Sequence, residues 1–252
     1  AVIDSEVSQK LLNPILNALN AFNIQQKNSF LDGTLGKQVF PAGFNLMDMP
    51  RIPGEACGKM FDSEGVATTN HYIIKDGVVQ EYFINTYMAN KLGIPPTVED
   101  ATRPYIPVVI GDTLRSGAGS AGIPPIASDG PLPLTVPRVA CLPEGIPITT
   151  VKQGDVPYHT VTRESIMALC GDGILVTDFC GGNSNPATGD FSYAIQGYRF
   201  KGGRIVHPVR EMLITGNIVT LWSNLIAAGD DARRCRAKLT PTLAFDNVDF
   251  SG

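Results

Sequence analysis

The sequence is poor in charge, and no part of it stays apolar for long. Only 17% of its 252 residues are charged, against about 25% in an average globular protein. Asp and Glu (24) outnumber Lys and Arg (20) and give a net charge of −4, so the basic excess typical of nucleic-acid binders is missing. No apolar run approaches the roughly 20 residues that span a bilayer. We therefore expect neither direct nucleic-acid binding nor membrane insertion.

The sequence also lacks the short motifs that mark self-contained catalytic sites. Its three histidines, His71, His159 and His207, lie far apart, and none belongs to an H-E-x-x-H or H-x-H pair that could hold zinc. There is no G-x-S-x-G elbow, no P-loop and no strand-linked G-x-G-x-x-G. We predict no catalytic residue and no metal ligand on this chain.

Five cysteines occur without a C-x-x-C pair, which speaks against a zinc ribbon or a thioredoxin-like site: Cys57, Cys141, Cys170, Cys180 and Cys235. We expect free thiols packed as small apolar groups in a reducing compartment. The chain begins Ala-Val-Ile-Asp without a basic and apolar leader, so we expect a cytoplasmic location. A nucleophilic Cys170 or Cys180 beside a histidine is an alternative that no spacing supports.

Helical and strand signals alternate along the chain, punctuated by 26 Gly and 19 Pro. Apolar periodicity and capping residues predict helices over 7–22 (split at Pro14), over 162–170 with an end at Gly171, and over 217–228 with Asn217 as the N-cap. Asp76-Gly77 and Gly202-Gly203 predict tight turns, and hence hairpins over 70–83 and 191–209, with a last strand over 242–245. The sequence therefore predicts an α+β fold, an antiparallel β-rich domain with hairpins and a few covering helices.

Residues 103–158 differ in texture from the rest of the chain. Ten prolines interrupt every regular period there, and 116–122 reads Ser-Gly-Ala-Gly-Ser-Ala-Gly. A stretch this long without regular structure is unusual inside a compact domain. We interpret it as a Pro/Gly-rich excursion from a single domain that covers 1–252.

The densest polar segment is Cys180-Gly-Gly-Asn-Ser-Asn-Pro-Ala-Thr-Gly-Asp-Phe-Ser192. Its glycines allow close backbone approach, and the side chains of Asn183, Asn185, Thr188 and Asp190 can cap turns or bind backbone groups. The segment therefore predicts either a loop that contacts a peptide or partner, or a well-capped structural turn. We take these four residues as the candidate contact site.

This segment resembles the C-terminal signature of the TldD/PmbA family, a G-x-N…T-G-D-F-S loop followed by a strand and a P-V…I-x-G-N run. Here the two blocks read Gly182–Ser192 and Pro208–Asn217. Three earlier blocks also match in order, Phe61-Asp-Ser-Glu-Gly-Val-Ala-Thr68, Asp76-Gly-Val-Val79 and Thr86-Tyr-Met-Ala-Asn-Lys-Leu-Gly93. The resemblance runs over nearly the whole chain.

The resemblance implies a function that the residues alone do not give. The TldD branch is a metallopeptidase with an H-E-x-x-x-H zinc helix, and the PmbA/TldE branch lacks that helix and forms the partner subunit. This chain has no H-E-x-x-x-H and is closer to the PmbA/TldE branch. The resemblance implies a non-catalytic subunit that shapes a cleft for unfolded peptides, with zinc on a TldD-like partner and no cofactor on this chain. It also implies that the N-terminal half of the family is absent.

Two other functions remain open at this point. The chain could be an autonomous hydrolase that uses Cys180 or a metal recruited between subunits. It could also be a pure interaction module, as the family's older label of DNA gyrase modulator implies. Low charge and many apolar strands predict that the chain associates with a TldD-like subunit or with itself.

Overall fold

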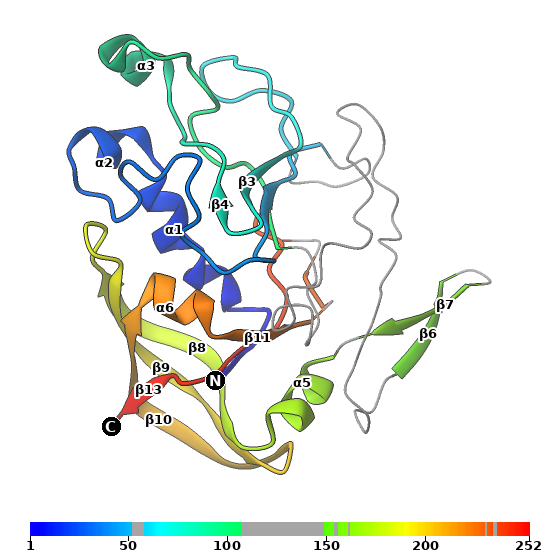
Figure 1. Cartoon of the computed structure of the whole chain (residues 1–252). Coiled ribbons are helices and arrows are strands. Elements are labelled where there is room, and N and C mark those ends of the chain that lie inside the picture. Colours follow the sequence, from blue (N-terminus) through cyan, green and yellow to red (C-terminus); the bar gives the residue numbers. More distant parts are fainter. Residues whose placement is uncertain (52–57, 107–148, 154–155, 161, 230, 234–235) are drawn as a thin grey trace.

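The computed structural model describes residues 1–51, 58–106, 149–153, 156–160, 162–229, 231–233 and 236–252. Their strands form a seven-stranded sheet, a four-stranded sheet and a two-stranded hairpin, with short helices packed against the two larger sheets (Figure 1). This arrangement confirms the predicted α+β, β-rich fold class. No helix in the described part of the chain is both long and apolar enough to cross a membrane.

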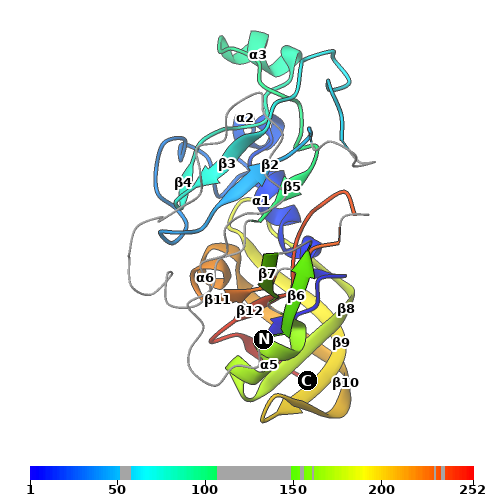
Figure 2. The ribbon, with the colours of Figure 1, turned by 90° about the vertical axis from the view of Figure 1, so that its right-hand side faces the viewer.

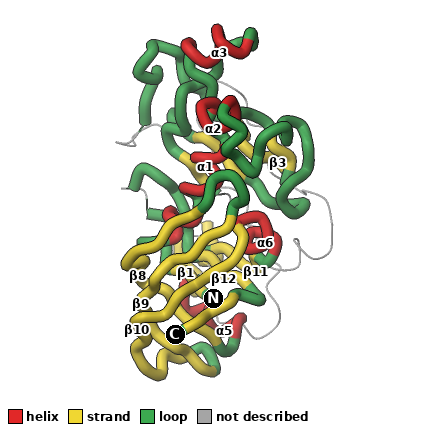
Figure 3. The backbone as a smooth tube through the Cα atoms, turned by 90° about the vertical axis from the view of Figure 1, so that its left-hand side faces the viewer, coloured by secondary structure: helices red, strands yellow, loops and turns green. Residues whose placement is uncertain are grey.

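The larger sheet is built on three long antiparallel strands, β8 (Gly173–Ser184), β9 (Asp190–Lys201) and β10 (Arg204–Asn217). Figure 3 shows them side by side at the surface. The strand order is β11-β12-β1-β8-β9-β10-β13, and the short members are β1 (Val2–Ile3), β11 (Leu225–Ala228), β12 (Leu243–Phe245) and β13 (Asp249–Ser251). The predicted turn at Gly202-Gly203 is confirmed, with φ of +56° and +72°.

The smaller sheet has the order β4-β3-β2-β5. Its members are β2 (Leu46–Asp48), β3 (His71–Lys75), β4 (Val78–Val79) and β5 (Pro104–Tyr105). The predicted Asp76-Gly77 hairpin is confirmed, because both residues take positive φ (+54° and +78°) between β3 and β4. Its second strand is shorter than the predicted run to Phe83.

The excursion is not structureless throughout. β5 lies at its start, and β6 (Thr149–Gln153) pairs with β7 (Val156–Thr160) near its end. The prolines within these strands are tolerated because β5 is an edge strand and β6–β7 is an isolated hairpin. The rest of the predicted excursion, 107–148, lies outside the described residues.

The predicted helix over 7–22 is three short pieces, η1 (Ser8–Leu11), α1 (Asn13–Ala18) and α2 (Ala21–Gln25). Pro14 lies in the first turn of α1, where its missing N–H costs nothing, so it starts a helix instead of kinking one. α3 (Thr86–Leu92) begins at the cap Asn85. α5 (Arg163–Cys170) is capped by Thr162 and ends at Gly171, as predicted.

The predicted helix over 217–228 is wrong in its second half. α6 (Ile218–Ser223) begins at the predicted cap Asn217, but Leu225–Ala228 is the strand β11, paired with β12. A short apolar run fits a buried strand as well as a helix, and here the ladder to β12 provides its backbone hydrogen bonds.

The core joins the two larger sheets. Trp222 of α6 is fully buried and contacts Phe44, just before β2, and Phe245 of β12, at ring-centroid distances of 4.9 and 5.4 Å. On the other face of the large sheet, Ile166 and Met167 of α5 pack on Phe200 of β9. The β8–β9 turn and the β9–β10 turn lie at opposite ends of β9, and α5 packs next to the β9–β10 turn.

Candidate functional site

The predicted loop over 181–190 is the end of a hairpin. β8 continues through Gly181, Gly182 and Asn183 and pairs with β9, so that the turn itself covers only 185–189. The prediction of a longer loop was wrong because Gly and Asn disfavour strands in general, whereas here the long partner strand β9 supplies the ladder. Asn183 pairs with Ser192 on the outer face of the sheet, and its side chain is exposed.

The other three predicted contact residues hold the turn together. The Asn185 amide oxygen accepts a hydrogen bond from the Ala187 N–H (2.9 Å). The Thr188 hydroxyl donates to the Asp190 carboxylate (2.7 Å). These bonds are those of a capped structural turn. They leave Asn183 as the one predicted residue whose side chain makes no hydrogen bond within the described structure.

Asn217 completes this network and was predicted only as a helix cap. Its amide nitrogen donates to the Thr188 carbonyl (2.8 Å) and to the Asp190 carboxylate (3.0 Å), while its amide oxygen accepts from the Val219 N–H at the start of α6 (3.0 Å). Hydrogen bonds from Asn217 and Thr188 hold the pKa of Asp190 below its usual range. One side chain therefore connects the turn, β9 and α6.

Beside this turn, β8 has an open edge. β1 covers β8 only at Leu175 and Val176, and no described strand pairs with that edge over 180–184. The Lys10 ammonium donates to the Phe179 carbonyl (2.6 Å) at one end of this stretch, and the Phe30 N–H donates to the Pro186 carbonyl (2.8 Å) at the other. Between these two contacts lie the last five residues of β8, 180–184, four of them exposed. We call Cys180–Ser184 the β8 edge.

The β8 edge presents backbone groups at alternate residues. The Asn185 N–H donates to the Asp190 carbonyl, which places the Ser184–Phe191 pair between two hydrogen-bonded pairs of the ladder. The N–H and C=O of Ser184, and by alternation those of Gly182, therefore point away from β9. Gly182 has φ of +106°, and a Cβ there would lie 2.1 Å from the Ser192 carbonyl oxygen, so only glycine fits.

The described residues do not form a nucleophilic or metal-binding cluster. Cys180 is exposed and contacts the Asp178 carboxylate at 4.0 Å, and none of its described contacts is with a histidine. Burial raises the pKa of the Cys170 thiol, which disfavours the reactive thiolate. No three His, Cys, Asp or Glu side chains among the described residues are arranged to hold a metal. Cys57, Cys141 and Cys235 lie outside the described residues.

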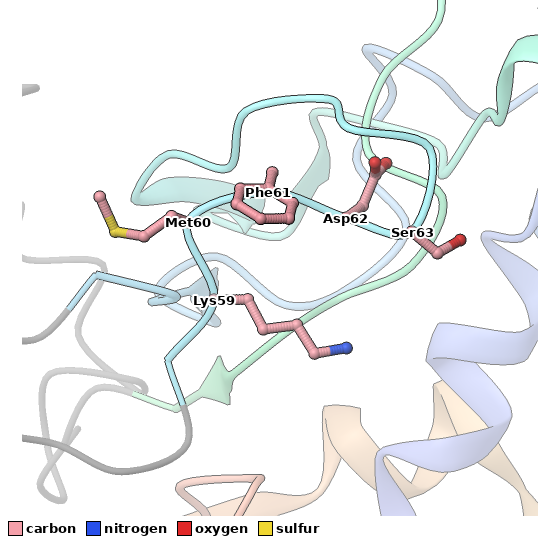
Figure 4. Close-up of a pocket in the computed structure, with 5 residues that line it drawn as sticks. All are labelled: Lys59, Met60, Phe61, Asp62 and Ser63. Carbon is pink, nitrogen blue, oxygen red and sulfur yellow. The ribbon is translucent and has the colours of Figure 1, made fainter.

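The start of the earlier sequence block Phe61–Thr68 helps to line a surface hollow that sequence reasoning did not single out as a site. Lys59, Met60, Phe61, Asp62 and Ser63 line it (Figure 4). The Asp62 carboxylate accepts the N–H groups of Glu64, Val66 and Glu99 and so fixes the loop. Met60 and Phe61 are 62% and 64% exposed. The matched F-D-x-E-G block is the signal that could have identified this loop.

His71 lies between two carboxylates at the base of that loop. Its Nδ1 is 2.7 Å from the Thr69 carbonyl and its Nε2 is 3.3 Å from a Glu81 carboxylate oxygen. Asp48, its cross-strand neighbour, is fully buried and accepts the N–H groups of Thr102 and Arg103. Burial raises the pKa of both Asp48 and Glu81. His71 is thus part of a buried polar network and not of the β8 edge.

Known proteins resemble this chain along its whole length. A PmbA homologue named as a metalloprotease, from Haemophilus influenzae, is 27% identical over 248 residues, which are 98% of this chain and 45% of that protein. A crystal structure of a protein named for modulation of DNA gyrase, from Bacteroides thetaiotaomicron, is 33% identical with a TM-score of 0.76 and covers 100% of this chain and 46% of the other. TldE from Thermococcus kodakarensis is 17% identical with a TM-score of 0.71 (100% and 49%), which shows the shared fold. The chain thus spans about half the length of these relatives.

The match to a family model agrees with the order of the sequence blocks. The model of the PmbA/TldA metallopeptidase C-terminal domain matches residues 1–113 and 145–252 and leaves out 114–144. The unmatched stretch falls within the Pro/Gly-rich excursion, in agreement with its unusual length. All seven strands of the large sheet lie within the matched residues, and so do the β8 edge and the turn that follows it. The chain therefore belongs to the PmbA/TldA metallopeptidase C-terminal domain family.

Proposed function

We propose that this chain is a non-catalytic, PmbA/TldE-like subunit of a cytoplasmic zinc metallopeptidase complex that acts on unfolded peptides. In this proposal a TldD-like partner holds the zinc, and the β8 edge forms one wall of the peptide cleft. The observation that carries it is the open edge at Cys180–Ser184, which lies within the family signature. An extended peptide can add to such an edge through its backbone and be held whatever its sequence.

The sequence supports the division of labour between two chains. None of its three histidines is part of an H-E-x-x-x-H. Without such paired histidines, a single cysteine of the chain cannot hold catalytic zinc. Related curated proteins carry the name metalloprotease, and we assign to this chain the binding role within such an assembly. Elemental analysis of the chain alone and of its complex with a TldD-like chain tests this. We expect zinc only in the complex, and about one zinc per isolated chain would refute the proposal.

Backbone recognition at the β8 edge can be tested with peptides. We expect an unstructured peptide to bind the complex with similar affinity when its side chains are scrambled. N-methylation at two alternate residues removes two N–H donors, each worth about 1 kcal/mol, and should weaken binding roughly 25-fold. Equal binding of the methylated and unmethylated peptides would exclude strand addition.

A substitution in β8 tests whether the peptide binds at the β8 edge. Ser184→Pro removes an outward N–H without touching the ladder to β9, so peptide binding should fall about five-fold while the fold is kept. Gly181→Ala is the matched control, because a Cβ there meets nothing within 4 Å. Equal losses in both variants would assign the effect to general disruption.

Peptidase activity of the complex and thermal stability together distinguish contact residues from structural residues among the four predicted positions. Asn183→Ala should lower peptidase activity of the complex and leave thermal stability unchanged. Asn185→Ala, Thr188→Ala and Asp190→Ala should lower stability, because their side chains cap the turn. Unaltered activity of all four folded variants would remove the turn from the site.

A further inference from the structure

The far end of the β9–β10 hairpin carries a concentration of positive charge in an acidic protein. Residues 191–210 contain three arginines, one lysine and one histidine and no Asp or Glu, although the chain as a whole has a net charge of −4. This end lies at the base of the molecule in Figure 1, and Figure 2 shows it from the side. It is separated by the length of β9 from the β8–β9 turn.

The register places four of these side chains on one face. Arg199 pairs with His207 and Lys201 pairs with Arg204. Because side chains alternate along β9, both pairs project to the same side. All four residues are exposed. We call them the basic face.

The opposite side of the same hairpin is packed against α5. Phe200 is buried with Ile166 and Met167, and the Gly203 N–H donates to the Gly171 carbonyl (2.8 Å). The Asp172 carboxylate accepts the Gly202 N–H (2.8 Å). The basic face is therefore on the exposed side of the hairpin, opposite α5.

The charges of the basic face are not compensated within the described structure. None of Arg199, Lys201 and Arg204 takes part in an ion pair or hydrogen bond through its side chain there. Like charges directly opposite each other on neighbouring strands destabilise a sheet. Lys201 and Arg204 form such a pair, and this is a cost to folding that packing does not explain.

We propose that the basic face binds an acidic, extended segment of a partner protein, with carboxylates at alternate positions. Arg199 and Lys201 are two residues apart, roughly 6.7 Å along the strand, which is the spacing of alternate side chains in an extended segment. Arg is suited to hold a carboxylate through two parallel hydrogen bonds. This proposal is independent of the peptide cleft at the β8 edge.

Two other occupants fit the observations less well. A second copy that paired this hairpin with itself would place cations against cations. A nucleic acid is disfavoured by the net charge of −4 of the whole chain, because nucleic-acid binders normally have a basic excess. Val206, 58% exposed in the irregular part of β10 before His207, adds apolar contact area that suits a polypeptide. Pro208 lacks an N–H and lies in the part of β10 that β13, paired only at Leu213–Thr215, does not cover, which favours side-chain docking over addition of a further strand.

The experiment uses the full chain and a labelled peptide with Glu at every second position and Val between. We expect binding by fluorescence anisotropy that weakens between 50 and 200 mM salt. Replacement of each Glu by Gln should abolish it. The Arg199→Gln/Arg204→Gln double variant should lose about five-fold or more in affinity, and Lys37→Gln, which removes an exposed cation elsewhere, should not.

A stability measurement separates this role from a structural one. Lys201→Gln removes one member of the like-charge pair Lys201–Arg204, so its melting temperature should rise by about 1–3 °C while peptide affinity falls. A structural lysine would lower the melting temperature when replaced. The proposal is overturned if the Gln peptide binds as tightly as the Glu peptide, if the double variant binds like the wild type, or if a DNA duplex binds more tightly than either peptide.

Discussion

Asn217 offers the sharpest test of how the β8–β9 turn is held. Asn217→Ala removes the N-cap of α6, worth about 1 kcal/mol, and the hydrogen bond to the Thr188 carbonyl, worth about 1 kcal/mol more. The free energy of unfolding should therefore fall by about 2 kcal/mol. For a domain of this size, the melting temperature should drop by roughly 4–8 °C.

Asn217→Asp divides this effect into its parts. An aspartate keeps the oxygen that accepts the Val219 N–H, so the cap is retained, but it loses the donor to Thr188 and places a second carboxylate beside Asp190. We expect a loss of stability smaller than that of Asn217→Ala at neutral pH. The loss should shrink further in acid, where the two carboxylates no longer repel each other.

Urea unfolding followed by circular dichroism is the assay, with Asn90→Ala as the control. Asn90 is exposed in α3, and alanine is the better helix former there, so this variant should be as stable as the wild type. Surface substitutions usually change the free energy of unfolding by no more than about 0.5 kcal/mol. If the free energy of unfolding of Asn217→Ala differs from that of the wild type by no more than this, the hydrogen-bond network of Asn217 does not hold the turn.

Three further predictions use other parts of the fold. Gly182→Ala should destabilise the chain by about 1–3 kcal/mol because of its φ of +106° and the clash with the Ser192 carbonyl, whereas Gly181→Ala should be tolerated; equal melting temperatures would contradict this. The pKa of Glu81 is raised in the folded state, so the folded chain holds a proton on Glu81 more tightly than the unfolded chain. The free energy of unfolding should therefore fall as the pH rises from the pKa of Glu81 in the unfolded chain to its pKa in the folded chain, and Glu81→Gln should flatten that part of a curve of stability against pH. The pKa of Asp190 is lowered, so its contribution is present above the unfolded pKa and is lost in acid; Asp190→Asn should lose stability at pH 7 and little near pH 2.

The sequence predicted the elements whose ends are marked by local chemistry. Asp76-Gly77 and Gly202-Gly203 fix their turns through positive φ, and Thr162 and Asn217 begin helices by capping. It failed where a distant partner decides the outcome. Leu225–Ala228 is a strand because β12 lies beside it, and Gly181–Asn183 is a strand because β9 does.

The segment of the candidate site was chosen from the sequence, but the roles of its residues were not. The Gly-Gly-Asn motif and the family blocks led to the β8–β9 hairpin, and its part in binding stays a prediction. They could not show that Thr188 and Asp190 bond to each other and to Asn217, or that Gly182 and Ser184 face an uncovered edge. These properties follow from the register of β8 on β9 and from the short pairing of β1 with β8, which local sequence patterns do not determine.

The two ends of β9 differ in how their polar groups are satisfied, and this difference separates scaffold from contact surface. At Asp190 the carboxylate has two donors and a lowered pKa, so the turn gains stability from its polar residues and needs no ligand to explain them. At Lys201 the charge faces Arg204 across the strand pair, a like-charge pair that destabilises the hairpin, and a bound anion would offset this repulsion. A residue pattern that costs the isolated chain stability is better evidence for a partner than one that stabilises it. By this criterion the basic face indicates association more directly than the capped turn that the sequence first suggested.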